Sequence, residues 1–170
     1  MTRALGDNAK VLLDDGVCKF MVTSARSLMD ANSDVMDFAD VTGCRIDVDE
    51  SRTELKQKDK DGKDVSCVPA RYRSTYTFNV IINVNNPYFN EIRFRLNGKT
   101  VEINNVIVNA YNRSNIDQRK SIDYCEYEKL GQEIADTLTH IRTTVRENIA
   151  AANAPKASVK CPFCGSVIEA

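Results

Sequence analysis

The chain has 170 residues, of which 42% are hydrophobic and 28% charged, and its formal net charge is −1. This length accommodates one domain of ordinary size plus an appendage. The near-neutral charge disfavours binding of nucleic acid or anionic lipid through a global basic field. No stretch has the length of a signal peptide's apolar core or of a membrane span, so we expect a cytoplasmic protein without a membrane span.

The first two thirds of the chain have the alternation and turn signals of an antiparallel β protein. Asp15-Gly16 separates apolar runs at 10–14 and 17–23 and predicts a hairpin. A strand with inward Cys44, Ile46 and Val48 follows. The charged residues 51–64 then predict an exposed hairpin tip or loop.

The clearest alternation of apolar and polar residues covers 76–85 and ends at Asn86-Pro87. Another strand is expected over 91–96, after which Asn97-Gly98 predicts a hairpin into Val101 and Ile103. Six to seven strands without a long helix between them favour a small sandwich or a partly open barrel. The sequence therefore predicts a β-rich domain over residues 8–108.

The remaining third predicts a linker, a helix and a tail. Residues 109–121 are polar and basic without periodicity, and 153–170 form a tether and tail. Between them, a helix is predicted over 122–152, because apolar residues recur at spacings of three or four. These residues, named below as the helix stripe, are Tyr127, Leu130, Ile134, Leu138, Ile141, Val145 and Ile149. A small sheet covers only part of so long a helix, so we expect its distal half to pair with another chain.

Cys161-Pro-Phe-Cys164-Gly165 is the sharpest local motif. Two thiolates at this spacing bind one tetrahedral metal, and zinc is the metal that such pairs usually hold. A structural zinc needs four ligands, so Cys161 and Cys164 form a half-site. A second chain or an upstream cysteine can complete it, or the pair is a remnant of a longer ribbon. The alternative, a redox dithiol, requires the pair at the start of a helix, which its place after a tether disfavours.

Other chemistry-bearing residues favour ordinary structural roles. The only histidine, His140, is placed at the edge of the helix stripe, without a nucleophile near it in sequence. The isolated Cys18, Cys44, Cys67 and Cys125 are predicted to be small buried hydrophobic residues, because a reducing cytosol disfavours disulfides. The acidic run at 47–50 lacks the ligand pattern of a calcium loop and predicts a solvated face.

A set of basic and aromatic residues offers a ligand patch as an alternative to solubilising surface positions. Its members are Arg71, Arg73, Arg93, Arg95, Arg113, Tyr72, Tyr76, Tyr88 and Phe89. If they lie together, they predict binding of a lipid or a peptide at the surface of the β-rich domain. The near-neutral charge disfavours nucleic acid as a ligand of the chain.

Several segments resemble a group of uncharacterised bacterial proteins, found in Gram-positive organisms, that carry zinc-ribbon modules around a central domain. The similar segments are 41–54, 64–72, 85–94, 131–134 and 161–165. Proteins of that group usually begin with a cysteine-rich ribbon, for which this chain has no counterpart, and often end with a second CxxC pair. The group has no established activity that the resemblance would transfer.

The segment Asp37-Phe-Ala-Asp-Val41, between early hairpins and later strands, also resembles bacterial pleckstrin-homology-like domains. That resemblance implies a bent, partly open barrel capped by the C-terminal helix. Together these patterns predict an α+β, mostly antiparallel protein that is not an enzyme. We expect an interaction or scaffold module that dimerises through its helix and a shared zinc knuckle. Lipid or peptide binding is the alternative, and thiol-redox chemistry at Cys161 and Cys164 a more distant one.

Overall fold

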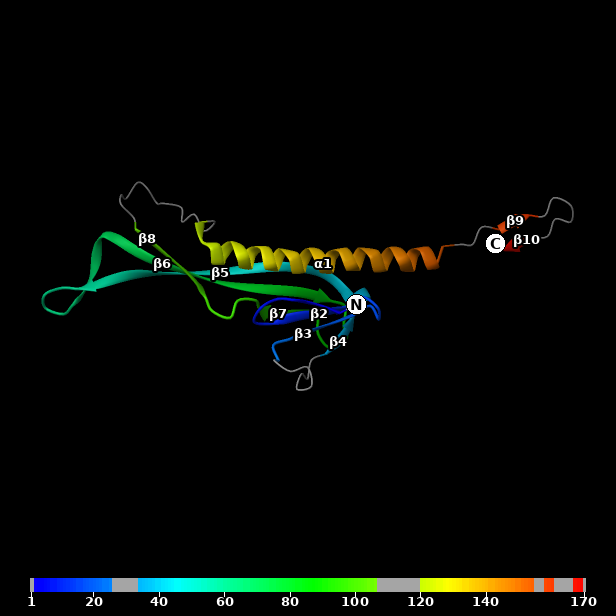
Figure 1. Ribbon diagram of the computed structural model, residues 1–170, viewed down its shortest axis with the longest axis horizontal. Helices are drawn as coiled ribbons and strands as arrows, with labels where there is room; N and C mark the ends of the chain where they lie inside the picture. The colour runs from blue at the N-terminus through cyan, green and yellow to red at the C-terminus, as the bar shows by residue number, and fades with distance from the viewer. Residues whose placement is uncertain (1, 26–33, 107–119, 155–157, 161–166, 170) are drawn as a thin grey trace.

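The computed structural model describes residues 2–25, 34–106, 120–154, 158–160 and 167–169. Their elements, in chain order, are β1 (Thr2–Leu5), β2 (Lys10–Asp14), β3 (Lys19–Thr23), β4 (Val35–Asp37), the 3₁₀ helix η2 (Phe38–Asp40), β5 (Val41–Lys58), β6 (Asp64–Val84), β7 (Glu91–Arg95), β8 (Val101–Val106), α1 (Ile122–Ala152), β9 (Ser158–Lys160) and β10 (Val167–Glu169). The predicted α+β class with mostly antiparallel strands is confirmed (Figure 1). Within the described ranges, no helix has the length and apolarity needed to cross a membrane.

The N-terminal sheet contains β1 to β4 in sequential order, each strand antiparallel to the next. The hairpin predicted around Asp15-Gly16 is confirmed, because β2 and β3 pair across it. Strand β1 also belongs to this sheet, because it pairs with β2. It lies before residue 8, where the β-rich domain was predicted to begin. Val11, Leu13 and Phe20 point inward, and all three are at most 2% exposed. Hydrophobic burial on one face therefore holds this sheet against the rest of the chain.

The second sheet is built on one long hairpin, in which the 18 residues of β5 pair with the 21 residues of β6. Residues 51–64 were predicted to be an exposed hairpin tip or loop. They do contain the tip of this hairpin, but the turn itself covers only 59–63, and the rest belongs to the two strands. Asp59 closes this turn, because its carboxylate accepts hydrogen bonds from the amides of Asp61 and Lys63. Strand β6 also begins twelve residues before Tyr76, where the sequence alternation becomes clear. A bulge containing a cis Val68-Pro69 bond interrupts it.

The hairpin predicted at Asn97-Gly98 is wrong. Strands β7 and β8 do not pair with each other; both pair with β6, β7 with residues 79–83 and β8 with residues 71–76. The Asn97 side chain bridges the interruption between them, because its Nδ2 donates to the carbonyl of Tyr76 at 3.2 Å and its Oδ1 accepts from the amide of Phe78 at 3.0 Å. The side-chain amide thus replaces a missing backbone partner of β6.

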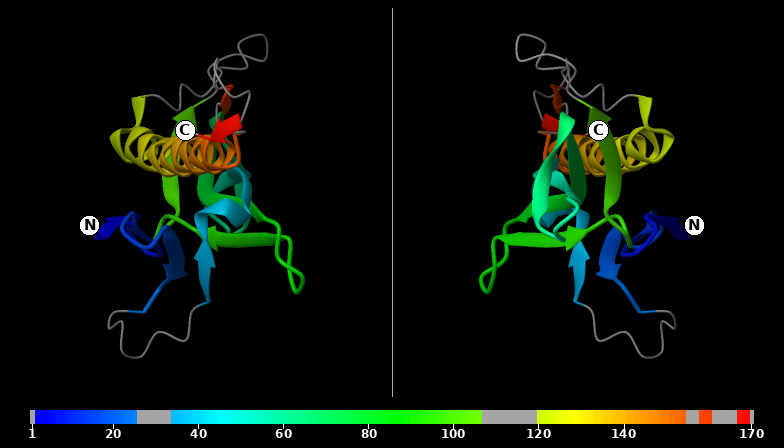
Figure 2. Two further views of the ribbon diagram at one scale, coloured as in Figure 1. Left: turned by 90° about the vertical axis from the view of Figure 1, so that its right-hand side faces the viewer. Right: turned by 90° about the vertical axis from the view of Figure 1, so that its left-hand side faces the viewer.

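Helix α1 coincides with the predicted range 122–152. Ser121 caps its N-terminus by accepting a hydrogen bond from the amide of Tyr124 at 3.3 Å. Gly131 allows a close approach to the sheet, since a Cβ there would lie 2.8 Å from Cδ1 of Ile46. Figure 2 shows α1 lying over both sheets.

The core is one apolar cluster shared by both sheets and α1. Its fully buried members include Val11, Phe78, Val80, Ile134 and Leu138. Among the described strands no ladder joins the two sheets, so they do not close into a barrel. Most of the helix stripe is used in this core, and Ile149, at 49% exposed, lies at its outer end. The helix therefore buries most of its apolar face against its own chain.

Candidate functional site

The predicted zinc ligands Cys161 and Cys164 lie outside the described residues, as does most of the predicted linker, with Arg113. The strands on either side of the cysteine pair are described: β9 and β10 pair antiparallel, with Lys160 opposite Val167. In the sequence, the CxxC motif stands between these two paired strands. In the parts of the chain with assigned positions, no group of three or more histidine, cysteine or acidic side chains is arranged to hold a metal ion.

The isolated cysteines differ in exposure. Cys44 is half-buried on β5, and burial raises the pKa of its thiol to about 11, against a smaller lowering by Arg45. Cys67 and Cys125 are also half-buried, whereas Cys18 is exposed. The prediction of a buried residue is therefore wrong for Cys18. It lies in the β2–β3 turn with a φ of 54°, a conformation that its sequence neighbours did not indicate.

The predicted basic and aromatic residues do not form one patch. Tyr76 is 1% exposed within the core, while Tyr88 is 90% exposed in the β6–β7 loop. Arg73 on β6 pairs with Glu102 at 3.5 Å, and Arg93 on β7 pairs with Asp47 at 2.8 Å. These arginines are neutralised by partners on neighbouring strands, which is the ordinary role that the sequence favoured.

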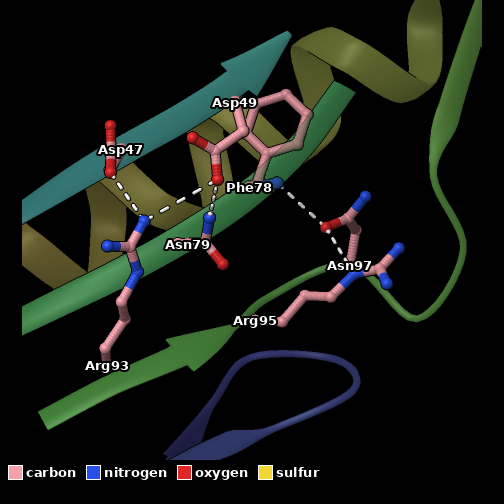
Figure 3. Close-up of polar contacts among 7 residues, drawn as sticks. All are labelled: Asp47, Asp49, Phe78, Asn79, Arg93, Arg95 and Asn97. Carbon is pink, nitrogen blue, oxygen red and sulfur yellow. Dashed lines mark hydrogen bonds and ion pairs between the residues drawn. The ribbon is translucent and has the colours of Figure 1, made fainter. Parts of the chain in front are cut away.

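The Arg93 pair belongs to a polar cluster on the face of the second sheet opposite α1 (Figure 3). Arg93 also lies 3.7 Å from the carboxylate of Asp49, which accepts a 2.7 Å hydrogen bond from Asn79. Arg45 and Glu91 form a further pair at 3.8 Å. The carboxylates of Asp47 and Asp49 in the predicted acidic face are thus engaged with Arg93 on β7 and Asn79 on β6.

Strand β5 has an unpaired outer edge. In the second sheet it pairs only with β6, so that one side of its backbone meets no strand among the described residues. The direction in which each backbone group of β5 points follows from the hydrogen bonds that β6 makes on its other side. The amide of Phe78 donates to the side chain of Asn97, and its carbonyl accepts from the amide of Leu96. The amide of Val84 donates to the carbonyl of Asn90. All three hydrogen bonds lie on the side of β6 that faces β7, away from β5.

In an antiparallel pair, residues directly opposite one another either bond to each other or both point away. Because Phe78 bonds away from β5, its opposite residue Val48 also points away from β6. By alternation, the amides and carbonyls of Ile46, Val48, Glu50, Arg52 and Glu54 face the open edge. This edge lies between two bulges of the ladder, at 41–43 and 55–56. It is the longest unpaired row of backbone donors and acceptors that we identify in the described fold.

The outer part of the β5–β6 hairpin, with β8, extends past the N-terminal end of α1 (Figure 1). We name residues 51–73 together with residues 104–106 of β8 the distal wing. Its side chains include a stacked pair, since the Arg52 guanidinium lies 4.2 Å from the centre of the Tyr72 ring. Val68 in the bulge is 94% exposed. The wing therefore presents backbone edges and an apolar side chain without a helix beneath them.

His140 lies where the sequence placed it, at the edge of the helix stripe, and is exposed. The fold adds a neighbourhood that sequence distance concealed. His140 lines a cavity of about 300 Å³ between α1 and the N-terminal sheet, and Cys18 lines the same cavity. A nucleophile and an imidazole are thus brought to one place from opposite ends of the chain.

Comparison of the chain with protein-family models, with curated proteins and with solved structures found no match in any of the three.

Proposed function

We propose that this chain is a non-enzymatic, cytoplasmic interaction module that binds an extended segment of a partner protein along the outer edge of β5. The observation that carries the proposal is the row of outward amides and carbonyls from Ile46 to Glu54. An exposed strand edge is a template for an added strand, with backbone hydrogen bonds supplying affinity and alternate side chains supplying selectivity.

The neighbouring side chains favour such binding. On the face opposite α1, Arg45 and Asp47 already pair with Glu91 and Arg93, so an added strand would not have to neutralise them. On the other face, Ile46 and Val48 are half-buried apolar residues of the core. A partner strand would therefore extend an existing apolar row beside α1.

The charge pattern favours a partner of different sequence over a second copy. Antiparallel pairing of two β5 strands centred on Asp49 or on Glu50 would place that carboxylate opposite its own copy. Pairing centred on Val48 would place Asp47 opposite Asp49. Like charges directly across a ladder are destabilising. The partner segment should instead carry neutral or basic side chains opposite residues 47–50.

Selection of linear peptides from a random library, followed by amide chemical-shift mapping, tests the proposal. Selected peptides should shift the amides of Val48, Glu50 and Arg52 more than those of Asp47, Asp49 and Ser51. Recovery of no binding peptide, or shifts confined to other surfaces, would contradict it.

A matched pair of variants isolates the backbone contribution. Glu54→Pro removes one outward amide, while the ladder to β6 uses the neighbouring residues. Glu54→Gln removes the charge and keeps the amide. Peptide affinity should fall about fivefold in Glu54→Pro, the equivalent of one hydrogen bond, and stay within about twofold in Glu54→Gln. Equal affinities for the two variants would show that the edge is not used.

The C-terminal hairpin supports a second candidate function, self-association through zinc. We infer that Cys161 and Cys164 of two chains together form one four-thiolate site, because one CxxC pair supplies two of the four ligands that a structural zinc needs and, in the sequence, stands between the paired strands β9 and β10. Native mass spectrometry of the reduced chain should detect a dimer with one zinc. A monomer without metal, or a dimer unchanged by double substitution to serine, would contradict it.

The pleckstrin-homology-like architecture belongs to the same proposal. Two antiparallel sheets followed by a covering C-terminal helix support it, although the described sheets do not close. Lipid binding receives less support than peptide binding, because the basic and aromatic residues are dispersed and Arg73 and Arg93 are ion-paired. Flotation with anionic vesicles at low salt checks this, and we expect no bound protein.

A further inference from the structure

The N-terminal sheet has a second face, which points away from the core. Because successive side chains of a strand point to opposite faces, the residues between the buried ones lie on this outer face. The strand pairings align one such residue from each strand in a row across the sheet: Ala4, Leu12, Met21 and Val35. All four are apolar, although the solvated face of an antiparallel sheet is usually polar.

The apolar row borders a hollow of about 250 Å³. Leu12, Met21 and Val35 line this hollow, together with Val17 from the β2–β3 turn. Val17 is 61% and Val35 59% exposed, so both side chains meet solvent in the single chain. Val35 also lines a second hollow, of about 460 Å³, with Tyr88, which is 90% exposed. Exposed apolar side chains that gather on one surface are typical of an interaction site.

Charged side chains flank the apolar row on the same face. On β2, Lys10 and Asp14 lie on either side of Leu12. Asp14 is opposite Lys19 on β3, and Lys19 forms an ion pair with Asp37 on β4 at 3.3 Å. These two lysines and two aspartates give the face no net charge. A second copy of the same face would therefore not be repelled and could offer a carboxylate to each lysine.

We propose that this outer face is the interface of a weak symmetric dimer, in which the N-terminal sheets of two copies pack face to face. A two-fold axis parallel to the strands, between β2 and β3, places β2 of one copy over β3 of the other. Leu12 then lies over Met21 of the second copy, within the apolar row. Asp14 lies over Lys19 of the second copy, and symmetry forms this contact twice.

A two-fold axis perpendicular to the strands fits the same face less well. It would place Val35 over Val35 and Ala4 over Ala4, so that large side chains meet at one end of the row and small ones at the other. It would also place Lys19 over Thr23, without a carboxylate. With the axis parallel to the strands, Ala4 of each copy lies over Val35 of the other, which is the alternation of large and small side chains that close packing needs.

The size of the face predicts weak association. Four strands of about five residues, at about 4.8 Å between strands and 3.3 Å per residue, span roughly 300 Å². Stable interfaces bury about 800 Å² on each partner, so this dimer should form only at high protein concentration. The interface does not include β5, which belongs to the other sheet. Failure of the dimer would therefore leave the proposed binding at the β5 edge untouched, and the reverse also holds.

Sedimentation velocity of the full chain, from about 10 µM to about 1 mM, tests the proposal. A reductant and a zinc chelator are present throughout, so that Cys161 and Cys164 cannot join two chains through a metal or a disulfide. The mean sedimentation coefficient should rise with concentration from the value of a monomer toward that of a dimer. A monomer over the whole range would overturn the proposal.

A matched pair of variants locates the interface. Met21→Lys places a charge in the middle of the apolar row and should weaken dimerisation by about tenfold or more, because the ammonium group would be desolvated without a partner. Val68→Lys adds the same charge in the distal wing and should leave dimerisation unchanged. Thermal unfolding confirms that both variants fold. Equal dimerisation of Met21→Lys and the native chain would overturn the proposed interface.

A second pair tests the direction of the two-fold axis, since Lys19→Glu and Lys10→Glu reverse the same charge on the same face. Lys19→Glu places a carboxylate over Asp14 of the second copy at two symmetric contacts. It should weaken dimerisation about tenfold at low salt and less in about 1 M salt. Lys10→Glu should change dimerisation by less than about twofold. A loss of dimer in Lys10→Glu but not in Lys19→Glu would overturn the proposed arrangement.

Discussion

The two halves of the β5–β6 hairpin share the same strands and the same type of backbone ladder, yet they are stabilised differently. Beneath α1, the hairpin buries Phe78, Val80 and Ile82 completely. In the distal wing, Val65 is 36% and Val68 94% exposed, and polar contacts such as Lys58 with Asp64 at 2.7 Å connect the strands. The backbone ladder therefore continues well beyond the region that the helix covers, with polar side-chain contacts in place of apolar burial.

We therefore expect the two halves of the hairpin to contribute to different properties: the covered half to stability, and the uncovered half to binding. The covered half contributes apolar burial, the dominant favourable term in folding. The wing contributes less apolar burial, and it leaves backbone groups accessible. Substitutions should accordingly have large effects on unfolding in the covered half and small effects in the wing, and the predictions below test that division.

The largest effect is expected beneath the helix. Ile134 is 0% exposed, so Ile134→Ala removes buried methyl groups and leaves a cavity. It should lower the free energy of unfolding by about 3–4 kcal/mol in urea titration. Val65→Ala in the wing is the matched control, with an expected change below about 0.5 kcal/mol. Similar losses in the two variants would contradict the division.

A somewhat smaller loss is expected at the interruption between β7 and β8. Asn97→Leu would leave the amide of Phe78 and the carbonyl of Tyr76 without their bonds, at a cost of about 2–3 kcal/mol. Asn104→Leu in the wing loses one exposed contact to Arg73, at 3.3 Å, and should change stability by less than about 0.5 kcal/mol. Equal stabilities for Asn97→Leu and the native chain would show that the Asn97 bonds are not needed.

The alkaline limit of stability should depend on Cys44. Its folded pKa, about 11, lies above the ordinary value of 9.0, because burial disfavours the thiolate. The stability that this provides is complete below pH 9 and is lost as pH rises toward 11, since only the unfolded chain ionises readily there. After allowance for the partial exposure of Cys44, the loss is about 1–2 kcal/mol.

Urea titrations at pH 8 and pH 10.5 measure this effect. Cys44→Val should reduce the difference between the two pH values, whereas Cys67→Val in the wing should leave it unchanged. An identical alkaline loss in Cys44→Val would assign the effect to other groups.

The smallest effect is expected at Arg93 and its exposed acidic partners, Asp47 and Asp49 (Figure 3). Arg93 is 48% exposed, so Arg93→Ala should lower stability by less than about 1 kcal/mol despite two acidic neighbours. The difference from the native chain should shrink further in about 1 M salt, because screening weakens exposed pairs. A larger loss that salt does not affect would show that the cluster acts as buried structure.

The bounds of α1 were predicted closely from the sequence. Tyr127, Leu130 and Ile134 are spaced with the helical period, and these side chains pack against one face of the sheet. The length of β6 was underestimated, because the bulge at 67–70 interrupts the alternation that identifies a strand. The hairpin prediction at Asn97-Gly98 was wrong for a physical reason. The dipeptide is typical of turns, but here the side-chain amide of Asn97 bonds to β6, and β7 and β8 on either side of it both pair with β6. Only tertiary contacts distinguish these outcomes.

The candidate sites were predictable to different degrees. The CxxC motif is visible in the sequence, since its ligands are local. The open edge of β5 is not, because it depends on which strands pair with β6. The cavity shared by Cys18 and His140 is also invisible to local patterns, since the two residues approach only when α1 folds onto the N-terminal sheet.

Residue-resolved amide hydrogen exchange along β5 tests the availability of its outer edge most directly. In the free chain, the amides of Asp47, Asp49 and Ser51, bonded to β6, should exchange slowly, and those of Val48, Glu50 and Arg52 rapidly. A selected peptide should then slow the second set. Uniform protection along β5 in the free chain would show that its outer edge is already occupied and would contradict the proposed binding site.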